Sequence, residues 1–257
     1  MTDTFTLEPR GNELRFRRVR LAARTWITPQ YVRVRLEGGD LLGFASPGAD
    51  DHIRVFFPGG EVSSIEELRE APSREYTPLE WNAATGWLDL EFAVHGDDGI
   101  AAPWAASAPI GSPAGIGGPR GSTVLTGRPD SWFLAGDETA IPAIRRYASG
   151  MDAAATGRIL IEVPGADGEV PLDVPSGIDL TYAHRGAAPA GSVLGERIGR
   201  IGSDQRPDGS VFGFIAAEQA IVKPGRALLR HRWGLAADHV IVKGYWKRGE
   251  AEYHAPH

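Results

Sequence analysis

The chain has 257 residues, of which 42% are hydrophobic and 23% are charged, so it is long enough for two compact domains. Its formal net charge of −6 argues against nucleic acid as the main partner, because phosphate backbones bind basic surfaces. The lack of cysteine excludes disulfides, cysteine-ligated zinc and thiol redox chemistry. We find neither a signal-peptide pattern nor an apolar stretch of about 18 residues, so we expect a cytoplasmic protein without membrane insertion. We also expect a monomer.

The first half of the chain alternates apolar and polar residues, which is the pattern of strands with one buried face. Clear examples are residues 14–19, 31–36, 53–57 and 87–94. No long helical pattern precedes residue 125, so the strands predict an antiparallel β-barrel or sandwich. The segment 58–72 has two glycines and an acidic run, and we expect a loop there with one helical turn.

The stretch R-E-Y-T-P at 74–78 places an arginine, a tyrosine and a threonine together. In a strand, Arg74 and Tyr76 would share one face, Thr77 would lie on the other, and Pro78 would bend or end the strand at an edge. A guanidinium suits phosphate, and a tyrosine ring can stack on a flat ligand. The alternative is an ordinary edge strand with a surface arginine, and the motif alone favours that alternative.

The stretch V-H-G-D-D-G-I-A-A-P-W-A begins at Val94 and combines a glycine-flanked turn with a short helix from Ala101. Exposed N–H groups at a helix start can bind phosphate, so this turn and Arg74 together would suit a pyrophosphate. The alternative makes Trp104 a core anchor and His95 a hydrogen-bonded histidine at a strand end.

A glycine-rich stretch at 107–122 ends the first half. It opens no helix, so we interpret it as a tight turn and a short strand rather than as a dinucleotide fingerprint. The domain boundary is expected at T-G-R-P-D, which gives an N-terminal domain of residues 1–127 and a C-terminal domain of residues 128–257.

In the second half, short apolar strands alternate with helical patterns. This order predicts a parallel sheet connected by right-handed crossovers, and thus an α/β domain. The predicted strands are 131–135, 158–163, 178–183, 211–216 and 239–243, and the predicted helices are 139–147, 193–201 and 226–233. Ligands of such sheets bind beyond the carboxyl ends of the strands, which makes the loops at 136–139, 184–186, 217–219 and 244–249 the candidates.

Two of these loops stand out. In L-A-G-D-E-T-A-I-P, a strand runs into Gly136, and Asp137 or Thr139 can cap the helix that follows. The loop either faces a cofactor or only connects a strand to a helix. In V-K-G-Y-W-K-R-G-E, the basic residues Lys243 and Arg248 are expected at the end of the last strand, where they could attract an anion or be solvated.

Taken in order, five stretches resemble the siderophore-interacting protein family, whose members are flavin-dependent ferric-siderophore reductases related to ferredoxin reductases. The stretches are D-H-I-R-V-F-F-P, R-E-Y-T, H-G-D-D-G-I-A-A-P-W-A, L-A-G-D-E-T-A-I-P-A-I and G-Y-W-K-R-G. The resemblance extends from about Phe16 to Gly249. It implies an N-terminal FAD-binding β-barrel and a C-terminal α/β domain that binds NADH or NADPH.

The resemblance also implies roles for single residues. Arg74 would contact the FAD phosphates, Tyr76 would pack against the isoalloxazine ring, and Thr77 would lie near its reactive nitrogen. The pyrophosphate region would be held by His95, Ala101 and Ala102. The nicotinamide side would be lined by Asp137, Glu138 and Thr139, with Glu218 at the next strand end. The ferric siderophore would lie near Lys243 and Arg248.

Arg185 follows a predicted strand and either meets a ribose phosphate or is a surface arginine. These two interpretations are even, so the choice between NADH and NADPH stays open. A proline at position 224 predicts that a helix starts there, with Pro224 in its first turn.

The chain departs from the family pattern at three positions that concern FAD. Leu79 stands where an arginine is common, Ala102 where serine or threonine is common, and Ser112 where aspartate is common. Backbone donors remain at these positions, so the departures bear on FAD affinity rather than on the identity of the cofactor.

The expected chemistry is hydride transfer from NADH or NADPH to FAD, followed by single-electron reduction of a ferric siderophore that releases ferrous iron. Iron is then substrate, and we expect no metal-ligand set in the protein. One alternative is a general NAD(P)H:flavin or ferric-chelate reductase. The other is a siderophore- or flavin-binding protein that uses another electron donor.

Overall fold

The computed structural model describes residues 5–94, 99–250 and 253. The chain divides into two compact units, Pro9–Val124 and Met1–Glu8 with Leu125–His257, and we describe each by itself. Among the described residues, no helix has the length and apolar character needed to cross a membrane. The predicted division into residues 1–127 and 128–257 stays a prediction.

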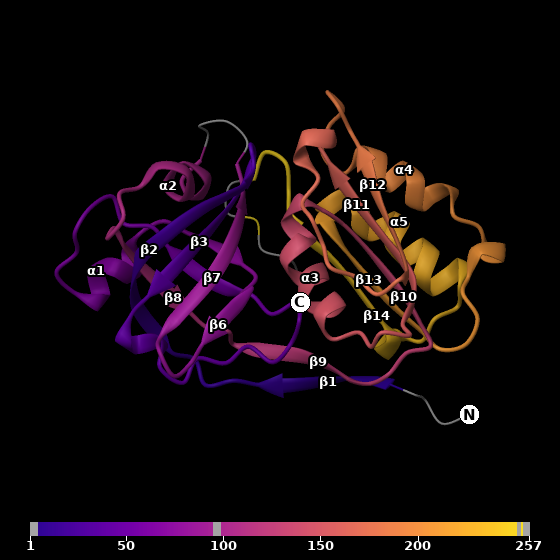
Figure 1. The fold of residues 1–257 in the computed structure, drawn as a ribbon, viewed down its shortest axis with the longest axis horizontal. Helices are drawn as coiled ribbons and strands as arrows, with labels where there is room; N and C mark the ends of the chain where they lie inside the picture. Colours follow the sequence, from indigo (N-terminus) through magenta and orange to yellow (C-terminus); the bar gives the residue numbers. More distant parts are fainter. Residues whose placement is uncertain (1–4, 95–98, 251–252, 254–257) are drawn as a thin grey trace. The chain divides into compact units, whose positions relative to one another are not determined.

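The first unit is built on an antiparallel sheet (Figure 1). Within the described residues, this sheet has seven strands in the order β5-β4-β8-β2-β3-β7-β6. The strands are β2 Phe16–Thr28, β3 Tyr31–Glu37, β4 Ile53–Phe56, β5 Ser73–Tyr76, β6 Glu80–Asn82, β7 Trp87–Ala93 and β8 Pro113–Gly117. The predicted antiparallel β architecture of the N-terminal half is therefore confirmed, and β5 and β6 are the edge strands of this sheet.

The alternation of side chains in β3 suits an inner strand of this sheet, with β2 and β7 as its neighbours. Val34 is fully buried in the core, whereas Arg33 and Arg35 point to the opposite face. There they bond to carboxylates of β7, Arg33 to Glu91 and Arg35 to Asp89, at 2.7 Å in each case. The strand thus buries one apolar face and pairs its charges on the other.

Two short helices and a 3-10 turn interrupt the strands of this unit. They are η1 Gly39–Leu41, α1 Ile65–Glu70 and α2 Ala101–Ser107. Helix α1 is the single helical turn predicted within 58–72, and the Ser64 hydroxyl caps it by accepting a bond from the backbone N–H of Glu67 at 3.1 Å. The glycine-rich stretch at 107–122 forms a turn and strand β8, as predicted.

Strand β2 is longer than predicted. The alternation of 14–19 continues as a strand to Thr28, but pairing with β3 is irregular between Leu21 and Ala23 and again between Trp26 and Thr28. Each irregularity moves the side chains to the other face, which hides the period-two pattern in the sequence.

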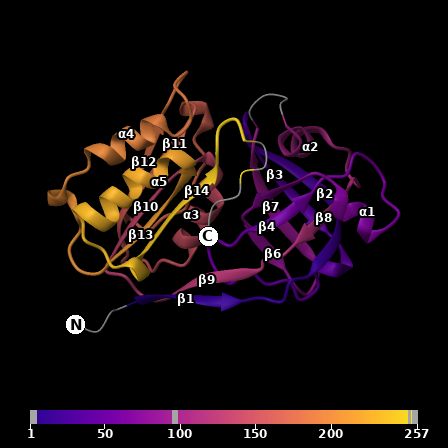
Figure 2. The ribbon, with the colours of Figure 1, turned by 180° about the vertical axis from the view of Figure 1, so that it is seen from behind.

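The second unit holds a parallel sheet (Figure 2). Within the described residues, its five strands have the order β12-β11-β10-β13-β14. The strands are β10 Ser131–Asp137, β11 Thr156–Val163, β12 Gly177–His184, β13 Val211–Glu218 and β14 Val240–Trp246, and the helices are α3 Ile141–Ser149, α4 Ser192–Arg200 and α5 Val222–Arg226. This confirms the predicted parallel α/β sheet.

The strand order creates a switch point. The chain builds outward from β10 through β11 to β12, then crosses back to place β13 on the other side of β10. The connections from β10 to β11 and from β12 to β13 therefore lead away in opposite directions, and the switch point is the place between β10 and β13 where the strand order reverses. A crevice beyond the carboxyl ends of these two strands is the expected ligand site of an open parallel sheet.

The helix predicted at 226–233 begins earlier than expected, at Val222. Pro224 lies in its first turn, as predicted, where its missing N–H costs no helical bond. The helix continues into a π-helical segment, Ala227–Arg232. At Gly225 a Cβ would lie 3.0 Å from a side-chain atom of Val242, so this glycine lets the helix pack closely on the sheet.

A two-stranded sheet of β1 (Phe5–Gly11) and β9 (Gly121–Gly127) was not predicted in this form. At its start the Phe5 side chain is 1% exposed. Its ring lies 6.1 Å from Phe212 and 4.3 Å from His239, so the beginning of the chain belongs to the core of the second unit.

Candidate functional site

In the first unit, the stretch R-E-Y-T lies at an edge of the antiparallel sheet. Strand β5 pairs with β4 only, with Arg74 opposite Val55 and Tyr76 opposite Ile53. The Arg74 side chain is half-buried and donates to the carbonyl oxygen of Ser73 at 2.7 Å. The predicted edge position is therefore confirmed, and the outer side of β5 has backbone groups that no neighbouring strand of this sheet uses.

The ring of Tyr76 belongs to an aromatic cluster. Its centroid lies 4.1 Å from that of Phe92 and 6.3 Å from that of Phe57. Burial raises the pKa of the Tyr76 phenol, and the nearby Arg74 guanidinium only partly offsets this effect. Tyr76 thus presents a neutral ring and hydroxyl at any physiological pH, while the adjoining Thr77 is 7% exposed.

Helix α2 lies against the same cluster through Trp104. The Trp104 ring is 5.1 Å from the ring of Phe57, which also contacts Tyr76. The indole N–H of Trp104 is buried and has no hydrogen-bond partner among the described residues. A buried donor without a partner costs free energy, so this atom is suited to an acceptor supplied by a ligand.

The ends of α2 differ in how they are satisfied. At its start, no side chain of residues 5–94 or 99–250 caps the helix at Ile100, so none of these side chains uses the first N–H groups, those of Ala101 and Ala102, as a cap. At its end, the Arg24 guanidinium donates to the carbonyl oxygens of Ala105 and Ala108, the latter at 2.6 Å. A cation at a helix C-terminus is favourable, which fixes α2 in place. His95 lies outside the described residues.

Leu79 explains one departure from the family pattern. It is 4% exposed and forms part of the apolar interior, and its N–H bonds to the carbonyl oxygen of Asp89 at 3.0 Å. Leucine has no donor for a phosphate, so at this position the chain uses the side chain for packing.

In the second unit, Asp137 joins the ends of three strands. Its Oδ1 accepts bonds from the backbone N–H of Thr139 at 3.0 Å and from the Thr139 hydroxyl at 2.5 Å. Its Oδ2 accepts bonds from the backbone N–H of Glu218 at 3.0 Å and the indole N–H of Trp246 at 2.8 Å. The carboxylate therefore connects β10 to β13 and β14 at the switch point.

Asp137 is fully buried, and burial is the main reason why its pKa rises to about 6. The neighbouring carboxylate of Glu138 raises the pKa further, while bonds from Thr139 and Trp246 lower it. The opposing effects make the charge of this group sensitive to mild acid.

Arg185 and Glu138 form a buried ion pair. The guanidinium donates to both carboxylate oxygens, at 2.8 and 2.5 Å, and the two side chains are 9% and 6% exposed. A second carboxylate, that of Glu162, lies 3.8 Å from the guanidinium. Arg185 is thus neither an exposed surface residue nor turned to solvent, and its predicted contact with a ribose phosphate stays a prediction.

Glu162 is a further buried charged residue of this region that was not predicted. This fully buried residue of β11 accepts bonds from the backbone N–H groups of Gly191 at 2.6 Å and Leu194 at 2.7 Å, at the start of α4. The signal for it is a charged residue at the end of an otherwise apolar strand, I-L-I-E-V. A charged residue is stable in the interior only when it forms hydrogen bonds or an ion pair. Its presence in an apolar strand therefore indicates a helix start or an opposite charge nearby.

Glu218 and Arg248 lie together at the next strand ends. Glu218 accepts bonds from the N–H of Ala220 at 2.7 Å and the N–H of Arg248 at 3.3 Å. The exposed Arg248 guanidinium donates to the carbonyl oxygen of Ala190 at 3.0 Å. Lys243 was expected at the end of the last strand, but β14 continues to Trp246, so Lys243 lies within the strand and is half-buried.

The predicted residues thus form two groups. In the first unit, Phe57 connects Tyr76 to α2. In the second, hydrogen bonds and ion pairs link residues at the ends of the parallel strands: Asp137, Glu138, Thr139, Arg185, Glu218 and Arg248. Among the described residues, no group of three or more His, Asp or Glu side chains is placed to hold a metal ion.

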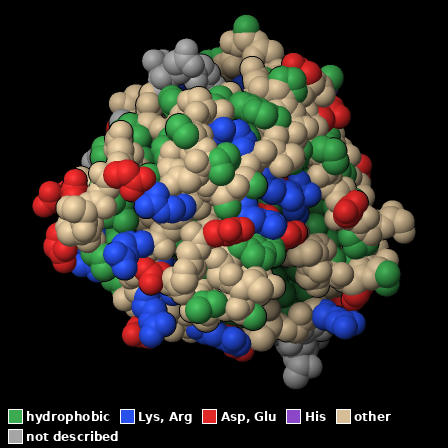
Figure 3. All heavy atoms as spheres, turned by 60° about the vertical axis from the view of Figure 1, so that its left-hand side comes forward, with side chains coloured by type: hydrophobic (Ala, Val, Ile, Leu, Met, Phe, Trp, Pro, Cys, Tyr) green, Lys and Arg blue, Asp and Glu red, His purple; other side chains and the backbone are tan. Residues whose placement is uncertain are grey.

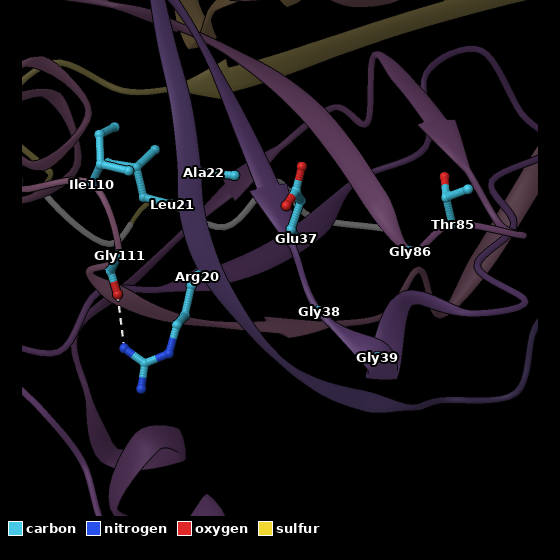
Figure 4. Close-up of a pocket in the computed structure, with 10 residues that line it drawn as sticks. All are labelled: Arg20, Leu21, Ala22, Glu37, Gly38, Gly39, Thr85, Gly86, Ile110 and Gly111. Carbon is cyan, nitrogen blue, oxygen red and sulfur yellow. Dashed lines mark hydrogen bonds between the residues drawn. The ribbon is translucent and has the colours of Figure 1, made fainter.

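The first unit also has an open pocket of about 590 Å³ that was not predicted. It is lined by residues of β2, β3 and the neighbouring turns, including Arg20, Glu37 and Ile110 (Figure 4). Arg20 donates to the carbonyl oxygen of Gly111 at 2.7 Å and forms an ion pair with Glu61. The lining contains none of the predicted ligand-binding residues. On the face shown in Figure 3, acidic and basic side chains are interspersed.

Comparison with known proteins gives two family matches. Residues 129–249 match the siderophore-interacting protein family, and residues 20–123 match the siderophore-interacting FAD-binding domain. The ferric vibriobactin reductase ViuB of Vibrio cholerae is 32% identical over 89% of this chain and 89% of its own length.

Two further proteins are informative. The NADPH-dependent ferric-chelate reductase of Escherichia coli is 34% identical over 52% of this chain and 57% of its own. A siderophore utilization protein from T. fusca has a crystal structure that superposes with a TM-score of 0.85, at 31% identity, over 97% of this chain and 98% of its own. The resemblance inferred from the five motifs is therefore confirmed.

Proposed function

Because this chain belongs to the siderophore-interacting protein family, we propose that it is an FAD-dependent reductase of ferric siderophores that takes electrons from NADH or NADPH. One observation in the first unit carries the proposal. The R-E-Y-T strand is an edge strand, and its Tyr76 lies in one aromatic cluster with Trp104, whose buried indole N–H has no partner within the part of the chain that the structure describes. An edge backbone, an aromatic ring and an unused donor suit a flat, polar cofactor such as FAD.

In this proposal, residues of β5 and α2 hold the cofactor. The Arg74 guanidinium binds the FAD phosphates, Tyr76 packs against the isoalloxazine ring, and Thr77 lies near the reactive nitrogen of the ring. The N–H groups of Ala101 and Ala102 bind the pyrophosphate. His95, which lies outside the described residues, is proposed to contact the same region.

Residues of the second unit position the electron donor. Asp137, Glu138 and Thr139 line the nicotinamide side, and Glu218 lies at the adjoining strand end. The bonds that Asp137 accepts from Thr139, Glu218 and Trp246 keep this edge of the sheet rigid. The basic residues Lys243 and Arg248 are proposed to lie near the ferric siderophore, which is often anionic.

FAD, when bound, supplies the ability to accept a hydride and to release electrons one at a time. One hydride from the nucleotide carries two electrons, and each ferric ion accepts one. One NADH or NADPH therefore reduces two ferric siderophores and leaves one oxidised nucleotide and one proton. Ferrous iron binds hard oxygen donors more weakly than ferric iron, so the metal is released, and we propose that this happens in the cytoplasm.

The Escherichia coli relative gives a second candidate, because its name specifies a ferric-chelate reductase. A protein of this kind would reduce a simple ferric chelate, such as ferric citrate, as fast as any ferric siderophore. Comparison of the two substrates on the same preparation decides between the candidates.

The test of the proposal is a visible absorption spectrum taken without oxygen. We expect FAD-loaded protein to lose its flavin bands on addition of NADH or NADPH and to regain them on addition of a ferric siderophore. Flavin that stays oxidised with both nucleotides would favour a protein that uses another electron donor. A chain that takes up no FAD would contradict the proposal entirely.

A further inference from the structure

The strand order of the second unit indicates where NADH and NADPH would be told apart. Numbered along the chain, the sheet has the order 3-2-1-4-5, the order of the first five strands of a dinucleotide-binding sheet. In such sheets, an acidic residue after the second strand bonds the ribose 2′-hydroxyl of NAD, whereas a nearby arginine accommodates the 2′-phosphate of NADP. The second strand here is β11, and its neighbour at the sheet edge is β12.

The carboxyl end of β11 is acidic. Glu162 is the penultimate residue of the strand, and Asp167 and Glu169 are exposed in the segment that follows. This segment, residues 164–169, contains no lysine or arginine. A basic group that contacts this segment is His184, whose Nε2 lies 2.7 Å from a carboxylate oxygen of Glu169. A phosphate of charge about −2 would meet mainly like charge at this position.

The described residues of β12 and of the loop between it and α4 contain one arginine, Arg185, at the carboxyl end of the strand. Both oxygens of Glu138 accept bonds from its guanidinium, and the Glu162 carboxylate lies within 3.8 Å of it. The side chain is 9% exposed. To bind a phosphate, Arg185 would have to give up both of its bonds to Glu138 and its position beside the buried carboxylate of Glu162, which is strongly unfavourable.

The start of α4 is equally unsuited to an added phosphate. The N–H groups of Gly191 and Leu194, which a phosphate could otherwise bind, already donate to Glu162. Arg248 lies beside this loop, at the carbonyl oxygen of Ala190. Arg248 is proposed to lie near the ferric siderophore, and its charge is the same for NADH and NADPH, so it would not discriminate between them.

We infer that the second unit selects NADH over NADPH, and that Arg185 is a positioning residue that neutralises Glu138 and Glu162 rather than a ligand of a 2′-phosphate. The inference rests on the proposed function, because it names which of the two nucleotides is the donor. It also makes the acidic end of β11 the determinant of that choice.

The first experiment measures binding without electron transfer. Isothermal titration calorimetry of the full chain with 5′-AMP and with adenosine 2′,5′-bisphosphate compares the two adenosine ends directly. We expect the bisphosphate to bind no more tightly than 5′-AMP. Tighter binding of the bisphosphate, or no binding of either compound, would overturn the inference.

The second experiment measures reduction of FAD-loaded protein without oxygen. We expect the second-order rate constant with NADH to exceed that with NADPH by about tenfold or more, which corresponds to the loss of one charged hydrogen bond. An equal or faster reaction with NADPH would contradict the inference while leaving the proposed function intact. If neither nucleotide reduces the flavin, the proposed donor is wrong, and the calorimetric comparison still tests the 2′-phosphate.

Variants separate a positioning role from a phosphate contact. In Arg185→Ala, we expect the rates with NADH and NADPH to change by the same factor, so that their ratio is preserved. A selective loss of the NADPH reaction would show that Arg185 binds the 2′-phosphate. Arg158→Ala is the matched control, because this arginine is half-exposed on β11 and pairs with Asp179 on the surface. If Arg185→Ala does not fold, the wild-type ratios decide alone.

Discussion

Asp137→Asn tests whether burial or hydrogen bonding controls the charge of the carboxylate that joins three strand ends. Its pKa rises from 3.8 to about 6, which corresponds to about 3 kcal/mol between the two protonation states. Between about pH 6 and about pH 4, the folded protein holds a proton that the unfolded chain has lost. The contribution of Asp137 to the free energy of unfolding should therefore increase as the pH falls through this range, and asparagine removes this contribution.

The assay is urea unfolding of the wild type and the variant at a series of pH values. We expect the stability difference between them to grow in favour of the wild type by up to about 3 kcal/mol from about pH 7 to about pH 4. The NMR signal of the Trp246 indole N–H, which bonds to Asp137 at 2.8 Å, should titrate with a midpoint near the same pKa in the wild type only.

Asp179→Asn is the control. This carboxylate is exposed on β12, and among the described residues its ion pair is with Arg158. A stability difference that stays flat, or that shrinks toward low pH, would refute the reasoning. It would mean that the four donors around Asp137 outweigh its burial and hold its pKa at or below the ordinary value.

The remaining predictions concern the flavin site and the start of the chain. Arg74→Ala should purify with less FAD than Arg54→Ala, a variant of the neighbouring strand, as measured by absorbance ratio; equal occupancy would remove Arg74 from the site. Trp104→Phe keeps an aromatic side chain but removes the indole N–H, so FAD affinity should fall about tenfold with little change in melting temperature. Unchanged affinity in a flavin titration would exclude a hydrogen bond from the Trp104 indole to FAD. Phe5→Ala should destabilise the protein by about 3–5 kcal/mol in urea unfolding, whereas the exposed Leu14→Ala should change it by less than about 0.5 kcal/mol; similar effects would contradict the packing of Phe5.

Much of the fold follows from local pattern. Strict alternation in β3 and the short apolar strands of the second unit, such as β10, identify antiparallel and parallel sheets because each pattern reflects which faces are buried. Strand β2 was predicted too short, since two irregularities in its pairing interrupt the alternation. Phe5 was missed because its partners, Phe212 and His239, lie more than half the chain away in sequence.

The site was predictable to a smaller extent. Asp137 and Thr139 could be recognised as capping residues because both partners lie within one short loop. The pairing of Arg185 with Glu138 spans 47 positions, so no local pattern distinguishes it from a surface arginine. The sequence around Glu162 shows that a charged residue lies in an apolar strand. It does not show the partner, the backbone N–H of Leu194 in α4, because that residue lies 32 positions further along the chain.

The most direct test of the proposed function is the stoichiometry of ferrous iron formed per nucleotide oxidised. FAD-loaded protein, NADH and a ferric siderophore are mixed without oxygen, and ferrous iron is trapped by a coloured ferrous chelator. We expect two ferrous ions for each NADH, in a reaction that requires FAD. Oxidation of NADH without ferrous iron, or iron reduction of the same rate when FAD is omitted, would contradict it.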